Sequence, residues 1–317
     1  MLRDFFTPDL FASAIRMATP LALAAIGGTI CERSGVVNIA LEGMMLVSAF
    51  TGVVVALATG STWFGVVCAV AAGTLMALLH AFVCIDLRAE QVVSGTAVNI
   101  LALGLTGFLM EVIYGHPGTT DAAATLGPVF RFQGPTAGLT GAVWRWVEGV
   151  FLSHTPLVYV AVLVAVVAQW AMYRTRWGLR LRSLGEHPRA ADTVGISVRR
   201  GRYGAVLISG ALAGLAGANL SLEQVGSFTE GMTSGRGFIA LAANIFGRWT
   251  PVGSYLASLL FGFADALQIK MQIFRAVVRI PPQFFLMLPY ILTVVVLAGV
   301  MGRAIAPAAV GKPYEKE

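Results

Sequence analysis

The sequence predicts an all-α protein that crosses a membrane many times, and three observations support this fold class. Hydrophobic residues make up 57% of the 317 residues and charged residues only 12%, about half the charged share of a soluble domain. The apolar residues form runs of about 20, the length that spans a bilayer as a helix. Glycine and proline occur within these runs, and membrane helices tolerate both.

Nine segments have the length and composition of a membrane span. They lie near residues 10–30, 36–60, 62–85, 93–114, 156–173, 204–224, 231–247, 251–269 and 283–301. The seventh contains "SGRGFIALAANIFGRW", the least apolar of these stretches, and is compatible with a short span or with a re-entrant half-helix. The whole chain, residues 1–317, is therefore predicted to be one transmembrane domain.

Two longer connections separate the spans. Residues 115–155 are rich in glycine and proline and contain Trp144 and Trp146. Tryptophan favours the membrane–water boundary, so this connection predicts an outside loop with an interfacial helix. Residues 174–203 carry eight arginines against two acids, Glu186 and Asp192. Because Lys and Arg accumulate in cytoplasmic loops, we expect this connection to lie in the cytoplasm and not to bind nucleic acid.

The positive charges also predict the orientation of the chain. With nine spans and residues 174–203 inside, the N-terminus lies outside and the C-terminus lies in the cytoplasm. Segments expected inside then hold fourteen Lys and Arg residues, and segments expected outside hold seven. This two-to-one excess agrees with the rule that positive loops stay inside.

No pattern in the sequence indicates catalysis or metal binding. The segment "AAVGKPYE" near the C-terminus lacks the first glycine and the hydroxyl residue of a phosphate-binding loop. The three cysteines lie in or beside apolar runs without ligand-like spacing, so we expect small core residues. The four histidines, at positions 80, 116, 154 and 187, are scattered, and we expect them at interfaces or in loops. The sequence therefore predicts no catalytic residue and no metal site.

The basic connection contains "LRLRSLGEHPRAADTVGIS", residues 179–197. Pro188 suits the first turn of a helix, and residues 188–194 would form about two turns. A short helix on a cytoplasmic loop can dock into a groove of another protein. The alternative is a basic loop that only orients the chain, and the residues alone leave both open.

This stretch resembles the coupling loop of ABC importer permeases, which inserts into a cleft on the ATPase subunit. The residues that match the coupling pattern are Leu184, Gly185, Glu186, Ala190, Ala191 and Gly195. Three further segments resemble permeases for simple sugars, nucleosides and branched-chain amino acids: "ERSGVVNIALEGMMLVSAF" (32–50), "QVVSGTAVNILALGLTGFL" (91–109) and the stretch at 235–268. The resemblance covers nearly the whole chain in order.

The resemblance implies a type II ABC importer permease fold in the bacterial cytoplasmic (inner) membrane, working by alternating access. It implies three protein partners besides membrane lipid: an ABC ATPase subunit, a second permease (a paralogue or a copy) and an extracytoplasmic substrate-binding lipoprotein. ATP and Mg would bind the ATPase, and this chain would hold no cofactor. Family members commonly begin with a further helix, which we do not expect here, and this shorter form most resembles a permease of bacterial nucleoside importers.

Two other functions stay open. A branched-chain amino acid permease would favour a charge in the pathway to meet the zwitterion. A self-sufficient secondary transporter would be expected to carry paired acids in mid-span for ion coupling. Glu42 is a single acid and supports this function only weakly.

Polar residues inside the spans are candidates for the substrate pathway, because such residues are costly in a membrane. The candidates are Asn38, Glu42, Ser94, Thr96, Asn99 and Asn244. Five of them have a structural alternative: helix capping for the first two, and packing of small residues for the 94–99 face. Asn219 and Glu223 end the sixth span, where we expect them to meet water or to join the pathway.

Overall fold

The computed structural model describes residues 7–130, 144, 146–273, 287, 291 and 305–315, and within these it consists of helices joined by loops. In this described part of the chain, seven helical segments are long and apolar enough to cross a membrane. They are α2 (Pro8–Glu32), α3 (Leu41–Thr59), α4 (Thr62–Ala81) with its π-helical continuation η1 (Phe82–Asp86), α5 (Gln91–Tyr114), α7 (Pro156–Arg174), α10 (Val198–Ala218) with η3 (Asn219–Val225), and α12 (Pro251–Ile273).

Seven of the nine predicted spans lie on these helices. The predicted span at 231–247 contains only α11 (Arg236–Phe246), whose 11 residues would reach about 16 Å of the roughly 30 Å apolar core of a bilayer. The predicted span at 283–301 falls outside the described residues, apart from single positions. Residues 131–143 of the predicted outside loop also fall outside them, and beyond these the loop forms η2 (Glu148–Leu152).

The sequence encodes several helix ends locally. Proline occupies the first turn of α2 and of α7, where its missing N–H costs nothing. Ser61 accepts a hydrogen bond from the Phe64 amide and so caps α4. Gly60 ends α3 with a φ of 70°, a conformation that glycine adopts without strain. These signals explain why the helices fall close to the predicted spans.

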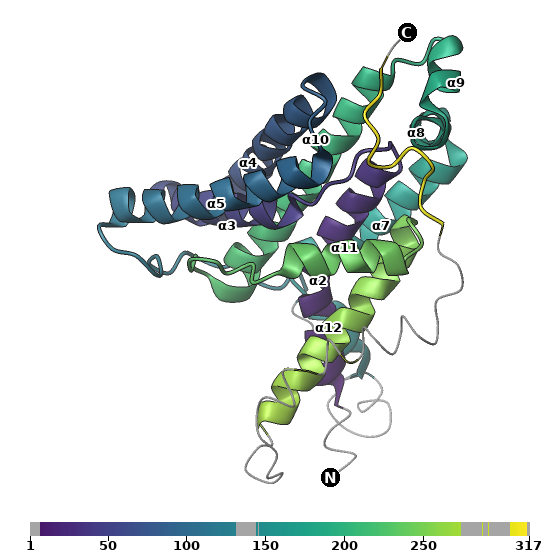
Figure 1. Ribbon diagram of the computed structural model, residues 1–317. Helices are drawn as coiled ribbons and strands as arrows, with labels where there is room; N and C mark the ends of the chain where they lie inside the picture. Colours follow the sequence, from purple (N-terminus) through teal and green to yellow (C-terminus); the bar gives the residue numbers. More distant parts are fainter. Residues whose placement is uncertain are drawn as a thin grey trace.

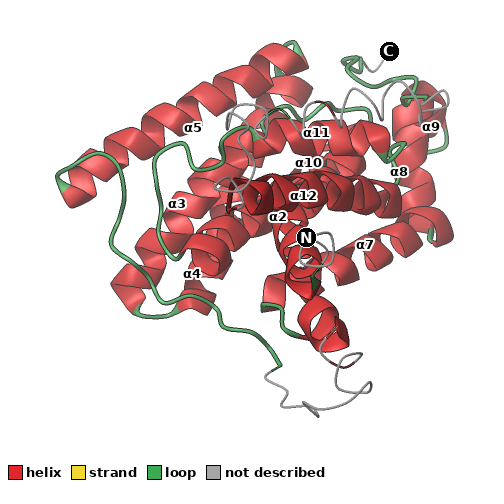
Figure 2. Cartoon of the chain, turned by 90° about the horizontal axis from the view of Figure 1, so that it is seen from below, coloured by secondary structure: helices red, strands yellow, loops and turns green. Residues whose placement is uncertain are grey.

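Helix α2 lies at the centre of the bundle and packs against α10, α11 and α12. Figure 2 shows α2, α10 and α12 in the middle, with α3, α4 and α5 on one side and α7 and α8 on the other. Glycines bring α4 and α10 together, because a Cβ on Gly210 would lie 2.3 Å from the Cβ of Ala77. Such close backbone approach is typical of helix packing in membranes.

The two described ends of the chain lie at opposite ends of this bundle (Figure 1). At one end, Lys270 of α12 donates a hydrogen bond to Thr7 just before α2, at 2.6 Å. At the other end lie the short helices α8 (Arg176–Glu186) and α9 (Pro188–Thr193) together with residues 305–315. We call residues 305–315 the C-terminal strap, because they cross the surface beside α8 and α9.

Candidate functional site

The helices α8 and α9 form a two-part surface at one end of the bundle. Thr175 caps α8 by accepting a hydrogen bond from the Gly178 amide at 3.2 Å. Pro188 starts α9, and Gly195 ends the connection with a φ of 82°. The helix expected at 188–194 is thus present at 188–193.

The six residues of the coupling pattern divide into two groups. Leu184, Gly185 and Ala191 are buried and hold the segment against the bundle. Glu186, Ala190 and Gly195 are exposed. Beside the exposed group lies a groove of about 540 Å³. Its lining is Arg176, Leu179, Arg180, Ser183, Glu186, His187, Ala190, Ala191, Val194 and Ile196.

This groove has the features of a docking surface. Leu179 and Val194 are 63% and 74% exposed, which is high for large apolar side chains that line a concave site. Arg176 and Arg180 stand at the same groove and add positive charge. An apolar centre with a charged rim suits a protein partner.

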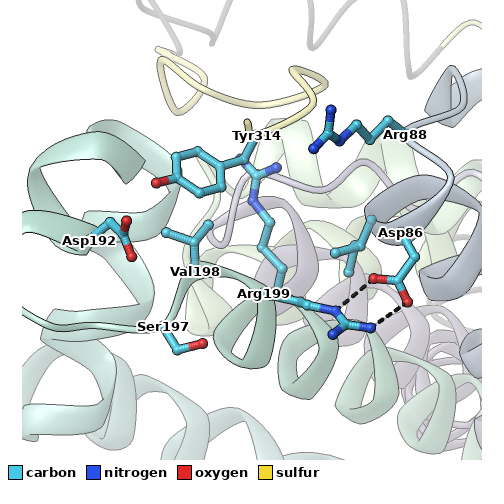
Figure 3. Close-up of a pocket in the computed structure, with 9 residues that line it drawn as sticks. Asp86, Arg88, Asp192, Ser197, Val198, Arg199 and Tyr314 are labelled. Atoms are coloured by element: carbon cyan, nitrogen blue, oxygen red, sulfur yellow. Dashed lines mark hydrogen bonds and ion pairs between the residues drawn. The ribbon is translucent and has the colours of Figure 1, made fainter. Parts of the chain in front are cut away.

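A second pocket, of about 350 Å³, joins the ends of α4 and α10 to the C-terminal strap (Figure 3). Arg199 forms a bidentate ion pair with Asp86 at 2.6 and 2.8 Å, and Tyr203 donates to the same carboxylate at 2.6 Å. On the strap, Glu315 pairs with Arg88 at 2.7 Å. The sequence analysis did not single out these pairs, because their partners lie more than 100 positions apart.

Gly185 lies directly against the end of α2. A Cβ at this position would be 2.3 Å from the Arg33 carbonyl oxygen, a distance that no Cβ can keep. The Gly185 carbonyl accepts a hydrogen bond from the Ala309 amide of the strap at 2.8 Å. Glycine is therefore required here so that α8, α2 and the strap can meet.

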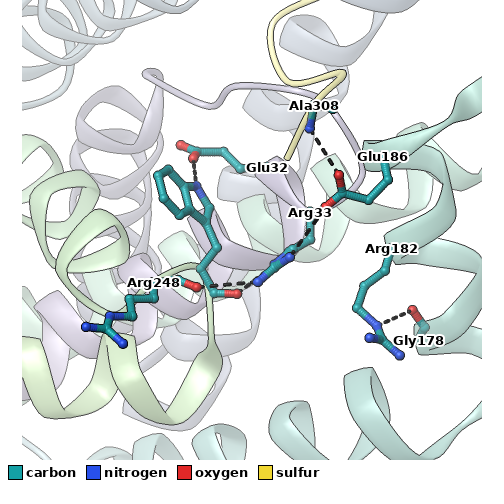
Figure 4. A network of polar contacts seen from close by, with 8 residues as sticks. Glu32, Arg33, Gly178, Arg182, Glu186, Arg248 and Ala308 are labelled. Atoms are coloured by element: carbon teal, nitrogen blue, oxygen red, sulfur yellow. Dashed lines mark hydrogen bonds and ion pairs between the residues drawn. The ribbon is translucent and has the colours of Figure 1, made fainter. Parts of the chain in front are cut away.

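A polar network leads from α8 into the bundle (Figure 4). Glu186 accepts a hydrogen bond from the Ala308 amide at 3.3 Å and pairs with Arg33 at 3.8 Å. Arg33 in turn donates to the carbonyl of Trp249 through Nε at 2.8 Å. The neighbouring Glu32 carboxylate accepts a hydrogen bond from the indole N–H of Trp249. Two adjacent residues at the end of α2 thus hold both the backbone and the side chain of Trp249.

Trp249 belongs to a tight turn between α11 and α12, which we call the elbow (residues 247–250). Arg248 and Trp249 have φ values of 54° and 53°, a left-handed conformation that is unfavourable for residues other than glycine. Gly247 packs so closely on α12 that a Cβ there would lie 2.2 Å from the Ser254 amide nitrogen. The surrounding contacts therefore hold the elbow in a strained shape.

Glu42 and Asn244, two predicted pathway residues, hold α11 near its two ends. The Glu42 carboxylate accepts hydrogen bonds from the amides of Gly235 and Gly237 at 2.7 and 2.6 Å, and so caps the N-terminus of α11. Buried Asn244 accepts a hydrogen bond from Thr29 of α2 at 2.7 Å.

The connection between α2 and α3 is held by two of the predicted pathway residues, Asn38 and Asn99. Asn38 donates to Ser209 of α10 at 2.8 Å. Asn99 accepts from the Gly43 amide at 2.8 Å and donates to the Ile39 carbonyl at 3.0 Å.

Ser94 is linked to the connection between α2 and α3 through His80, whereas Thr96 is exposed and bonds within its own helix. Ser94 hydrogen-bonds His80 at 3.0 Å, and the other ring nitrogen of His80 donates to the Val37 carbonyl at 3.0 Å. Thr96 is exposed on α5, and its hydroxyl donates to its own helix at the Val92 carbonyl. The structure does not bring all six candidates to one cavity.

For His80, which is buried within α4, the expectation of an interface or a loop is wrong. His154 lies in the loop before α7, as expected, and its side chain is buried. Burial lowers the pKa of His154 below its ordinary value, and its Nε2 donates to the Val150 carbonyl at 2.8 Å. Asn219 is also buried and donates to Glu223 at 2.5 Å, while Glu223 accepts from the Leu157 amide at the start of α7. This pair stabilises a helix start and does not simply meet water.

Comparison with known proteins gives a match over almost the whole chain. Residues 10–297 match the family model described as branched-chain amino acid transport system / permease component. The chain is 43% identical to the guanosine ABC transporter permease protein NupQ of Bacillus subtilis, over 94% of each chain. It is 38% identical to the nucleoside ABC transporter permease protein NupC of Lactococcus lactis, over 97% of this chain and 96% of that one.

A more distant match is to the guanosine ABC transporter permease protein NupP of Bacillus subtilis, at 28% identity over 78% of this chain and 70% of the relative. No solved structure gives a significant match.

Proposed function

The chain belongs to the family of branched-chain amino acid transport system permease components, and we propose that it is a permease subunit of an ABC importer for nucleosides. The seven long apolar helices among its described residues and its family make it a multi-pass protein of the cytoplasmic membrane. The choice of substrate rests on the near full-length similarity to two permeases named for guanosine and for nucleosides. Simple sugars are the second candidate, since a putative glucose permease of Haloferax volcanii is 35% identical.

The proposed orientation places α8, α9 and the C-terminal strap in the cytoplasm and the start of α2 outside. The arginine-rich composition of 174–203 supports it. The segment from Val225 to Trp249 supports a crossing at the predicted span 231–247. It begins next to Glu223, which bonds the start of α7, and it ends at Trp249, which bonds Arg33 beside α8. Only part of this segment is helical, so it crosses as a loop followed by α11.

The groove beside α8 and α9 is the proposed docking site of the ATPase subunit. Its exposed apolar side chains and arginines support docking of a separate protein, and Glu186 at its edge connects to α2 through Arg33. ATP and Mg then bind to the ATPase, and this chain holds no cofactor and catalyses no reaction.

The substrate pathway is proposed to run between this chain and a second permease, along α5 and α11. Exposed Thr96 is the candidate for direct contact with substrate. The other five candidates, Asn38, Glu42, Ser94, Asn99 and Asn244, keep the pathway wall in place through the bonds described above. Bacillus subtilis has two guanosine permeases, NupQ and NupP, both similar to this chain, which supports a paralogue as the second permease. A substrate-binding lipoprotein would dock at the end opposite α8.

Uptake of radiolabelled guanosine by cells with and without this gene tests the proposal. Deletion is expected to abolish uptake, and unlabelled nucleosides alone are expected to compete. Competition by ribose instead of nucleosides would indicate that the substrate is a sugar, and competition by leucine would indicate a branched-chain amino acid. Uptake that persists after the ATPase is inactivated would indicate a secondary transporter and overturn the proposal.

A further inference from the structure

Arg33 lies where three parts of the molecule meet: the end of α2, the end of α8 and the elbow between α11 and α12. Its side chain is 17% exposed, whereas that of its ion-pair partner Glu186 is 45% exposed. A half-exposed acid on the docking surface is thus linked through one nearly buried arginine to the interior of the bundle.

The guanidinium of Arg33 contacts acceptors on two sides. Its Nε donates to the Trp249 carbonyl at 2.8 Å, and one terminal nitrogen lies 3.4 Å from the Arg248 carbonyl. Its other terminal nitrogen pairs with Glu186 at 3.8 Å. The planar fork of arginine presents N–H groups in fixed directions, which a lysine ammonium does not. One rigid group therefore joins α8 to the elbow.

The elements on both sides of Arg33 are closely packed, so a displacement on one side is passed on. On the α8 side, Gly185 touches the backbone of Arg33 with no room for a methyl group. On the other side the elbow is strained at Arg248 and Trp249 and is held by Glu32. Close-packed elements of this kind move as units and do not deform gradually.

We propose that Arg33 is a positioning residue that transmits movement of α8 and α9 to the short helix α11. The far end of α11 is fixed by Glu42 at the start of α3, so a shift of the elbow changes the tilt of α11 against α2 and α3. The inference rests on the proposed function, because the movement originates in an ATPase docked on α8 and α9. Arg33 itself touches neither nucleotide nor substrate.

The test uses the complex of this permease with its ATPase, purified from native membranes through a tag on the permease. Phe238 of α11, 50% exposed, is replaced by cysteine. Half-exposed Cys68 is replaced by serine, which leaves Cys31 and Cys84 buried. The rate of reaction of the Phe238→Cys thiol with N-ethylmaleimide is measured with and without MgATP plus vanadate. In the parent complex, nucleotide is expected to change this rate.

Arg33→Ala is expected to abolish the response of the reaction rate to nucleotide while the ATPase still co-purifies. Nucleoside uptake should fall roughly 10-fold, within the range that couplings between distant sites span. Arg33→Lys should behave like Arg33→Ala, because it keeps the charge and loses the fork. Glu186→Ala, at an exposed position, is a second variant that should lower the response without affecting folding.

Arg182→Ala is the matched control. This arginine lies on α8, where it donates to the Gly178 carbonyl at 3.4 Å (Figure 4), and its guanidinium lies 4.9 Å from the ring centre of Tyr173 on α7. It should keep both the response and the uptake.

A normal response in Arg33→Ala, an equal loss in Arg182→Ala, or loss of the ATPase from the Arg33→Ala complex would overturn the inference and leave the proposed function standing. A parent complex that shows no response to nucleotide would also overturn the inference, whereas a parent complex that lacks an ATPase would overturn the proposed function itself.

Discussion

Replacing Gly185 with alanine measures how closely α8 must lie against α2. The new Cβ would stand 2.3 Å from the Arg33 carbonyl oxygen and 2.9 Å from its carbon, both backbone atoms that cannot rotate away. Ordinary van der Waals contacts begin near 3.5 Å, so α8 and α2 must separate by roughly 1 Å. Overpacking of this kind costs about 1–3 kcal/mol.

The same displacement affects the C-terminal strap. The hydrogen bond from the Ala309 amide to the Gly185 carbonyl, now 2.8 Å, would exceed the usual limit of about 3.2 Å if the strap did not follow. Its loss adds about 0.5–1.5 kcal/mol, while the better helix propensity of alanine returns at most about 1 kcal/mol. We therefore expect a net destabilisation of about 1–3 kcal/mol, together with reduced nucleoside uptake.

Thermal unfolding of the detergent-solubilised protein and uptake in complemented deletion cells measure the two effects. Gly204→Ala is the matched control, because a Cβ on this α10 glycine would meet no atom within 4 Å. It should leave uptake unchanged and should not lower the melting temperature. If Gly185→Ala melts and transports like the parent, the reasoning about the contact between α8 and α2 is refuted.

Glu42→Gln removes a negative charge from the N-terminus of α11, so the free energy of unfolding should fall by about 1 kcal/mol in a denaturant titration. Gly210→Leu forces α4 and α10 apart at Ala77 and should lower the melting temperature measured by intrinsic fluorescence, with an overpacking cost of about 1–3 kcal/mol. Trp249→Phe leaves the buried Glu32 carboxylate without its hydrogen bond from the indole N–H. The free energy of unfolding, followed by calorimetry, should therefore fall by about 1–3 kcal/mol.

Two exposed positions provide controls for these variants. Gly104→Leu on α5 places a side chain where a Cβ would meet nothing within 4 Å of this chain, so it should not lower the melting temperature of the isolated permease. Trp63→Phe changes a tryptophan that is 55% exposed and should be neutral. If a control is as destabilising as its test variant, the contact assigned to that variant is not the cause.

The helices of this protein could be predicted from the sequence because the membrane imposes a length and a composition on each span. The α11 segment shows the limit of this rule. Its 11 helical residues are too few for a full crossing. The sequence is compatible with both a short span and a re-entrant half-helix. The residue that caps α11, Glu42, lies 193 positions before the Gly235 amide that it bonds.

The candidate site could be predicted only in part, for a related reason. Glu186 and Gly185 stand out because they belong to a recognisable local pattern. Arg33 does not, although it is the second residue of the motif that begins at Glu32, since its partner Trp249 lies 216 positions away. Glu42 stands out in the sequence as an unusual polar residue, but its two bonds to α11 could not be read from its neighbours in sequence.

The most direct test of the central claim is nucleoside transport by purified components in a defined membrane. Proteoliposomes that contain this permease, its partner permease and the ATPase, supplied with the binding protein, would be loaded with MgATP on the ATPase side and given radiolabelled guanosine on the other. The account predicts guanosine accumulation that requires ATP hydrolysis and stops when this chain is omitted. Accumulation without ATP, or undiminished accumulation without this chain, would contradict it.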